Sequence, residues 1–314
     1  MRTLYWRRRA VALGATAALA AAVALLVSDC GGDDDGGERT GAQATGAAAE
    51  APPQQLPRGG RTILPGHRVV AFYGAPQDPQ LGVLGIGTPD QAGRRLARVA
   101  RRYERPGTPV LPAMELIAVI AAGHPGADGM YRTRQDPKVI RRYLRAARRM
   151  KALLILDVQP GRSDFLQEAR RLRRWLRQPD VSLALDPEWR VNAPDVPGQV
   201  IGTVSAREVN AVSFWLDRLA QRHRLPQKLL LVHRFTEGMI DDVTALKPRR
   251  NLALALNVDG FGDRAVKRAR YHELAAAAEH LHDGFKLFYE EDTDLLTPRQ
   301  VLRLRPPPDV VVYE

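Results

Sequence analysis

Eight short apolar segments recur along most of the 314-residue sequence, and each one is followed by a stretch with helix-like spacing. Short apolar runs that end at turn residues are typical of buried strands. Strands that alternate with helices predict an α/β protein with a parallel sheet. Eight such units in ~250 residues fit the size of a (β/α)8 TIM barrel. The predicted strands are residues 67–74, 109–117, 152–159, 181–188, 228–235, 252–260, 284–291 and 309–314.

Capping motifs mark where several of the predicted helices begin. A Ser or Thr followed three residues later by Glu or Gln satisfies free N–H groups at the start of a helix. The motifs are Thr88 with Gln91, Ser205 with Glu208, and Thr297 with Gln300. An open doubly wound sheet is the alternative fold, but no GxGxxG motif leads from a strand into a helix. The chain ends at Glu314, so the barrel is expected to lack its last helix.

The first 30 residues have the pattern of an export signal, with four arginines, an apolar run over residues 10–27, and then Cys30. In one interpretation Cys30 carries a lipid, as in bacterial lipoproteins. In the other, the apolar run remains as a membrane anchor. Both interpretations place the protein outside the cytoplasmic membrane, tethered to its outer face. Residues 31–60, rich in Gly, Ala, Asp and Pro, are predicted to be a disordered tether, and residues 61–314 the barrel domain.

Residue size predicts which side chains face the barrel axis, because side chains alternate between the two faces of a strand. In the fourth predicted strand, large apolar residues alternate with small ones, which leaves Asp186 and Glu188 facing inward. The same alternation in the other strands gathers six acids at one mouth, namely Glu115, Asp157, Asp186, Glu188, Asp259 and Glu290. Other inward-facing side chains at this end are Tyr73, Gln159, His233, Asn257 and Lys286.

Six carboxylates at one mouth suit acid–base chemistry. Glycoside hydrolysis needs two carboxyl groups beside one bond, one protonated as the acid and one ionised as base or nucleophile. Carboxylates that lie close together raise one another's pKa, which supplies the protonated partner. We therefore predict that Glu188 is the general acid/base, that Glu290 is its partner, and that Asp186 raises the pKa of Glu188.

The remaining polar and aromatic side chains of the mouth are predicted to bind the substrate, a carbohydrate or cell-wall polymer. Carboxylates hold sugar hydroxyls, and flat aromatic rings offer apolar faces on which sugars stack. These predicted substrate-binding residues are Tyr73, Glu115, Asp157, Trp189, His233 and Asp259.

The eight-unit pattern, with Glu188 after the fourth strand and Glu290 after the seventh, resembles the large clan of barrel glycosidases. This resemblance implies an acid/base on the fourth strand and a nucleophile on the seventh. Asp186-Pro187-Glu188 is also similar to the D-x-E end of chitinase-like barrels, which leaves a substrate-assisted scheme with Asp186 and Glu188 open. The whole domain, with its "LDVQPGRSDF" and "LALDPEWR" segments, resembles uncharacterised secreted lipoproteins of actinobacteria.

Two other functions remain open: a divalent-metal hydrolase, since oxygen-rich sites suit Mg²⁺, Mn²⁺ or Ca²⁺, and a non-catalytic carbohydrate- or wall-binding barrel. The sequence has no HExxH motif, and we predict neither a metal site nor a cofactor. The net charge of +12 and the basic segments 141–151 and 168–177 raise a nucleic-acid interpretation. Export and the lack of interleaved aromatic residues favour a solvated arginine-rich face, so no nucleic-acid partner is predicted.

Overall fold

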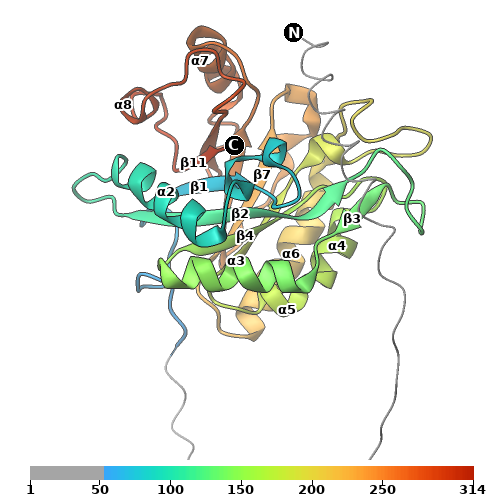
Figure 1. Ribbon diagram of the computed structural model, residues 1–314, viewed down its shortest axis with the longest axis horizontal. Coiled ribbons are helices and arrows are strands. Elements are labelled where there is room, and N and C mark those ends of the chain that lie inside the picture. The colour runs from blue at the N-terminus through green and yellow to red at the C-terminus, as the bar shows by residue number, and fades with distance from the viewer. Residues whose placement is uncertain (1–52) are drawn as a thin grey trace, which may run out of the picture.

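The computed structural model describes residues 53–314, which form a closed barrel of eight parallel strands surrounded by helices (Figure 1). The barrel strands are β1 (Arg68–Gly74), β2 (Val110–Ala121), β4 (Leu153–Val158), β5 (Val181–Leu185), β7 (Lys228–Arg234), β9 (Leu252–Val258), β10 (His282–Leu287) and β11 (Val310–Tyr313). Neighbouring strands pair in chain order, and β1 pairs with both β2 and β11, which closes the ring. The prediction of an α/β TIM barrel is confirmed.

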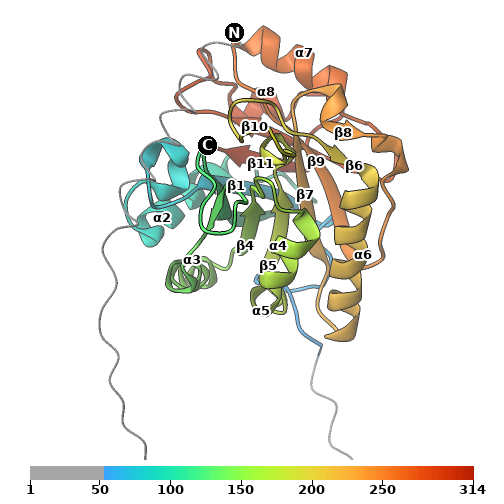
Figure 2. The ribbon, with the colours of Figure 1, turned by 90° about the vertical axis from the view of Figure 1, so that its right-hand side faces the viewer.

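The helices lie outside the strands, as Figure 2 shows for α3 to α6. They are α2 (Pro89–Arg101), α3 (Pro137–Arg149), α4 (Phe165–Arg171), α5 (Arg173–Leu176), α6 (Ala206–Arg222), α7 (Arg264–Leu274) and α8 (Pro298–Val301). Thr88 and Thr297 form the predicted capping boxes of α2 and α8, and the Ser205 side chain accepts from the backbone N–H of Glu208 at the start of α6. These motifs therefore begin helices where the sequence predicted them.

One predicted strand–helix unit differs from expectation. Within residues 53–314, the connection from β7 to β9 contains no α-helix, only 3-10 turns and the short β8 (Ile240–Asp241), which pairs with β6 (Val204–Ser205). Gly238 and Pro248 lie in this connection and disfavour a continuous helix. The structure also contains the short strand β3 (Arg132–Arg134), which was not predicted and which pairs antiparallel to the C-terminal end of β2.

Two apolar layers hold the barrel together, one on each face of the strands. The outward-facing layer between strands and helices is built from large residues such as Leu183 of β5 and Leu254 of β9. The layer on the barrel axis contains smaller ones at alternate positions, including Ala184 and Ala253. The alternation used to predict the inner face is therefore the alternation that packs the two layers.

The segment just before β1 closes the end of the barrel where the strands begin. Leu56, Ile63 and Leu64 are buried in the same apolar cluster as the inner strand residues. The Gln227 side chain accepts from the backbone N–H of Leu64 at 3.0 Å, which fixes this segment next to β7. The packed chain therefore includes Leu56, within the stretch 31–60 that was expected to be a tether.

The predicted export signal and Cys30 lie outside the described residues, as does most of the predicted tether. Among residues 53–314, no helix combines the length and the apolar character that crossing a bilayer requires.

Candidate active site at the barrel mouth

Polar side chains line the barrel axis at the end where the strands finish. Six of them come from six different strands. In each strand, the polar residue lies two positions after a residue of the inner layer and therefore points to the same side. The six are Tyr73, Glu115, Asp157, His233, Asn257 and Lys286, and each is at most 3% exposed. The alternation of side chains thus brings them together, as the sequence predicted. We call this group, with Asp186, Asp259 and Glu314, the mouth cluster.

His233 bridges two carboxylates across the barrel. Its Nε2 lies 2.8 Å from Oε1 of Glu115, and its Nδ1 lies 2.9 Å from Oδ2 of Asp259. A neutral imidazole carries one N–H, whereas two ring nitrogens that each face a carboxylate oxygen require two. Burial alone lowers the pKa of His233, but the Asp259 and Glu115 carboxylates outweigh it and raise that pKa well above 6.5. His233 is therefore a buried imidazolium at neutral pH.

The environment of the Asp157 carboxyl favours its protonated form. Burial raises its pKa well above 3.8, and the neighbouring Asp186 carboxylate raises it further, while His233 offsets only part of the effect. The Tyr73 hydroxyl donates to Oδ2 of Asp157 at 3.3 Å and accepts from Nε2 of Gln159 at 2.9 Å. Burial, and then the Asp157 carboxylate, raise the pKa of Tyr73, so Tyr73 keeps its proton.

Lys286 supplies the second buried cation of the mouth cluster. Its Nζ lies 2.7 Å from Oε2 of Glu314, 3.5 Å from Oδ2 of Asp259 and 3.7 Å from the centre of the Tyr73 ring. Glu314 was not among the residues predicted from the sequence. It follows Val310 and Val312 of the inner layer by the same alternation, so the signal was present in the last predicted strand.

The four residues that follow β5 are buried, although they no longer belong to a strand. The strand ends at Leu185, and Pro187, Glu188 and Trp189 form a 3-10 turn. Asp186 stays close enough to the cluster to act electrostatically on both Asp157 and Tyr73. Glu188 and Trp189 are each 7% exposed. Strand alternation therefore places Asp186, whereas the turn decides the positions of Glu188 and Trp189.

Glu290 lies apart from the buried residues. The seventh predicted strand was expected to continue to residue 291, but β10 ends at Leu287, and Glu290 is exposed in the turn that follows. In that turn the Asp292 carboxylate accepts from the backbone N–H groups of Phe288 at 3.0 Å and Gly262 at 3.1 Å. Glu290 itself is exposed, so it is not among the buried side chains that strand alternation brings together.

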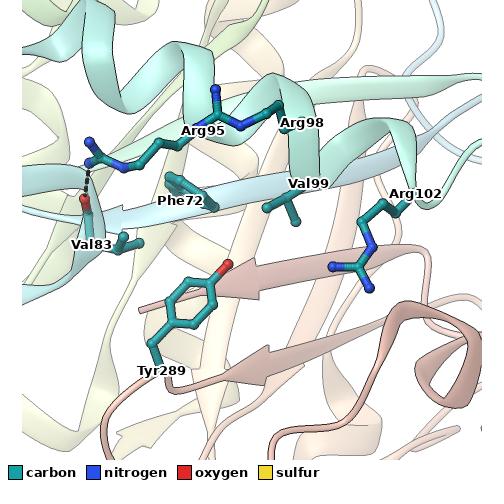
Figure 3. Close-up of a pocket in the computed structure, with 7 residues that line it drawn as sticks. All are labelled: Phe72, Val83, Arg95, Arg98, Val99, Arg102 and Tyr289. Carbon is teal, nitrogen blue, oxygen red and sulfur yellow. Dashed lines mark hydrogen bonds between the residues drawn. The ribbon is translucent and has the colours of Figure 1, made fainter.

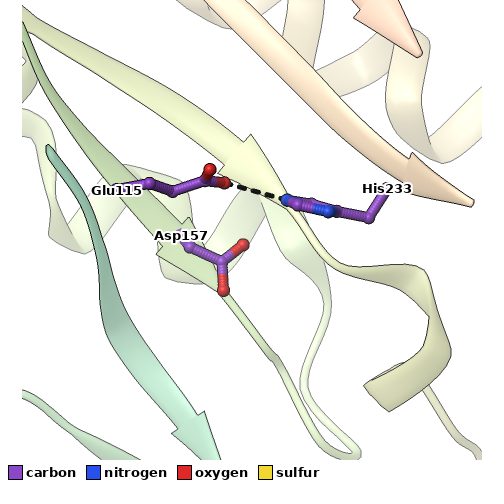
Figure 4. A group of neighbouring side chains, drawn as sticks. All are labelled: Glu115, Asp157 and His233. Atoms are coloured by element: carbon purple, nitrogen blue, oxygen red, sulfur yellow. Dashed lines mark hydrogen bonds and ion pairs between the residues drawn. The ribbon is translucent and has the colours of Figure 1, made fainter. Parts of the chain in front are cut away.

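Three members of the cluster have the spacing of a metal site. Ligand atoms of Glu115, Asp157 and His233 lie within 4.8 Å of one another, and Figure 4 shows the three side chains converging. Both nitrogens of His233 already face carboxylate oxygens, however, and a metal ligand must offer a free lone pair. A metal ion there would have to displace either the Glu115 or the Asp259 contact.

The fold and the mouth cluster together define a class: a TIM barrel with buried acids and cations at the end of the barrel where such folds carry their active sites. No family model matches this sequence, and no curated protein matches it either. What can be said of function therefore rests on the chemistry of the mouth cluster.

Proposed function

We propose that the protein is an exported, glycoside-hydrolase-like TIM-barrel enzyme that acts on cell-wall or extracellular polysaccharide. One observation carries this proposal: the buried Asp157 carboxyl has a strongly raised pKa and lies beside a second carboxylate, Asp186. A glycosidase needs one protonated and one ionised carboxyl group at the same bond. Environments that separate the pKa values of two neighbouring acids produce that combination.

The residue roles in this proposal differ from those predicted from the sequence. Asp157 replaces Glu188 as the proton donor, and Asp186 is its ionised partner. Glu290 has no role in the proposed mechanism, because it is exposed beyond the end of β10. The His233 imidazolium holds the Glu115 and Asp259 carboxylates in place.

Two buried oxygen atoms offer places for substrate hydroxyl groups. Among residues 53–314, neither Oε2 of Glu115 nor Oδ1 of Asp157 has a hydrogen-bond partner. Buried polar atoms normally have partners, and one left without a partner in a cleft is often satisfied by a ligand or water. Sugar hydroxyls can both donate to a carboxylate and accept from a protonated carboxyl group, so both atoms suit a carbohydrate.

A divalent-metal hydrolase is a second candidate, because Glu115, Asp157 and His233 have metal-ligand spacing. Protonation of both His233 and Asp157 opposes metal binding, since ligands must be deprotonated. The acid–base mechanism is therefore the better-supported function.

The test is release of new reducing ends from a panel of purified bacterial cell-wall glycans and neutral polysaccharides. We expect the wild type to release them in the presence of EDTA. The Asp157→Asn/Asp186→Asn double variant should give only the background rate, because it lacks both the acid and its partner. Equal rates from the two proteins would refute the proposal. Activity that appears only with added Mn²⁺ or Mg²⁺ would favour the metal hydrolase.

We also propose that the protein is held at the outer face of the cytoplasmic membrane, by a lipid on Cys30 or by the apolar run before it. Cells expressing the wild type or Cys30→Ala would be labelled with radioactive palmitate and then fractionated. Label in the wild type alone is expected for the lipoprotein, and a membrane-bound protein without label for the anchor. Recovery of the wild type in the cytosol would contradict both.

A further inference from the structure

A cavity of about 420 Å³ lies on the outer side of the barrel, between α2 and the turn after β10 (Figure 3). Arg95 and Arg98 of α2 and Arg102 at its end line one side, and Tyr289 lies on the opposite side. Phe72 of β1 and two valines complete the lining, which contains no carboxylate. The volume is within the range of small-molecule sites. This cavity is separate from the mouth cluster, because Phe72 faces the outer apolar layer.

The three arginines form one positively charged surface. Arg95 and Arg98 of α2 and Arg102, which caps its C-terminal end, lie on one side of the helix, because residues three and four apart are neighbours on a helix surface. Nη2 of Arg95 donates to the backbone oxygens of Val83 at 3.1 Å and Ile86 at 2.6 Å, which fixes that side chain. Within the described part of the chain, the guanidinium groups of Arg98 and Arg102 have no ion-pair partner. The cavity therefore offers cationic donors that no acid of the fold neutralises.

The opposite wall presents an aromatic ring in a fixed orientation. Tyr289 is 40% exposed, stacks on Tyr313 with ring centres 5.2 Å apart, and meets the edge of Phe72 at 6.3 Å. Burial raises the pKa of Tyr289, although Arg102 and Arg95 partly oppose this, so its hydroxyl remains a donor beside the arginines. An exposed tyrosine that neighbouring rings hold in place presents a flat surface for another ring without loss of side-chain freedom.

We propose that this cavity binds the phosphate ester of a ring compound such as a sugar, with the phosphate on the three arginines and the ring against Tyr289. A guanidinium group matches two phosphate oxygens at once. Several arginines with no acid among them favour a dianionic phosphate ester over a single carboxylate. The phosphate ester is either a free small molecule or a unit of a phosphate-bearing wall polymer.

The experiment measures binding by titration calorimetry at 150 mM salt, with phenyl phosphate, glucose 6-phosphate, glucose and a polysaccharide bearing sugar phosphate monoesters as separate probes. We expect the two phosphate monoesters to bind with Kd near or below ~1 mM, and glucose not to bind detectably. Binding of the small esters identifies a free ligand. Binding of the polymer alone, with the same variant pattern as below, identifies a polymer unit.

The variant Arg98→Gln/Arg102→Gln should weaken phosphate-ester binding about tenfold or more, because each charge-assisted contact is strong. Arg94→Gln/Arg101→Gln is the matched control, because both residues are exposed on α2, do not line the cavity and carry the same charge. We expect the control to bind within about twofold of the wild type, and both variants to keep the wild-type melting temperature. Equal losses in the two variants, or equal binding of glucose and its phosphate, would overturn the proposal.

Discussion

Replacement of His233 by alanine is expected to lower the free energy of unfolding by about 3–5 kcal/mol at neutral pH. The imidazolium lies between two carboxylates, at 2.8 Å from Glu115 and 2.9 Å from Asp259, and the ring is 1% exposed. Without it, two buried negative charges face each other with their main cation removed. Urea unfolding of the wild type and the variant, followed by circular dichroism, measures the difference.

The matched control is His282→Ala. His282 pairs with Asp309 at 2.8 Å, but both side chains are partly exposed to solvent, so the loss should stay below about 1 kcal/mol. The effect of His233→Ala should also depend on pH. Because the folded-state pKa of His233 is raised, its contribution is complete below about pH 6.5 and is lost as the pH rises through the folded-state value. A loss equal to that of the control, or one that does not change with pH, would contradict the bridging role.

The second large effect is expected for Asp157→Asn, which should reduce kcat on polysaccharide about 10²- to 10⁴-fold and leave KM nearly unchanged. Asparagine has the shape of the protonated acid but cannot release a proton. Wild-type activity should fall as the pH rises through the raised pKa of Asp157, because the proton donor is then lost. Initial rates measured across the pH range would show this decline in the wild type alone.

A change of leaving group separates loss of the acid from loss of the fold. An aryl glycoside whose phenolate departs without protonation should be hydrolysed by the variant at a rate much closer to that of the wild type. Asp195→Asn, in an exposed part of the connection after β5, is the control and should behave as the wild type does. Equal losses on both substrates would mean that Asp157 is not the acid.

The stability of Asp157→Asn should match or exceed that of the wild type at high pH, where the wild type must ionise a buried acid.

Most of the fold could be predicted from the sequence, because one physical rule governs both the strands and their faces. Apolar runs of strand length gave the eight strands, and the alternation of large and small residues gave the inner face. That rule correctly brought together Glu115, Asp157, His233 and Lys286. The helix predicted after β7 is absent from the connection that the structure describes there, and Gly238 and Pro248 in that connection disfavour it.

The candidate site was predicted less completely, for two reasons. Alternation applies only inside a strand, so it could not show that Glu290 is exposed in the turn after β10 or that Glu188 lies in a 3-10 turn. The protonation of each acid also depends on distances between strands, which a single sequence does not contain. We propose Asp157 rather than Glu188 as the acid, because burial beside Asp186 raises the pKa of Asp157.

The position of Glu314 has a practical consequence for anyone who produces this protein. Its side chain pairs with Lys286, its backbone N–H donates to Leu287, and its backbone oxygen accepts from Tyr289, so residue 314 lies at the rim of the mouth. An affinity tag fused after it would emerge beside the mouth cluster. A tag placed before Leu56 emerges at the opposite end of the barrel and leaves the rim clear.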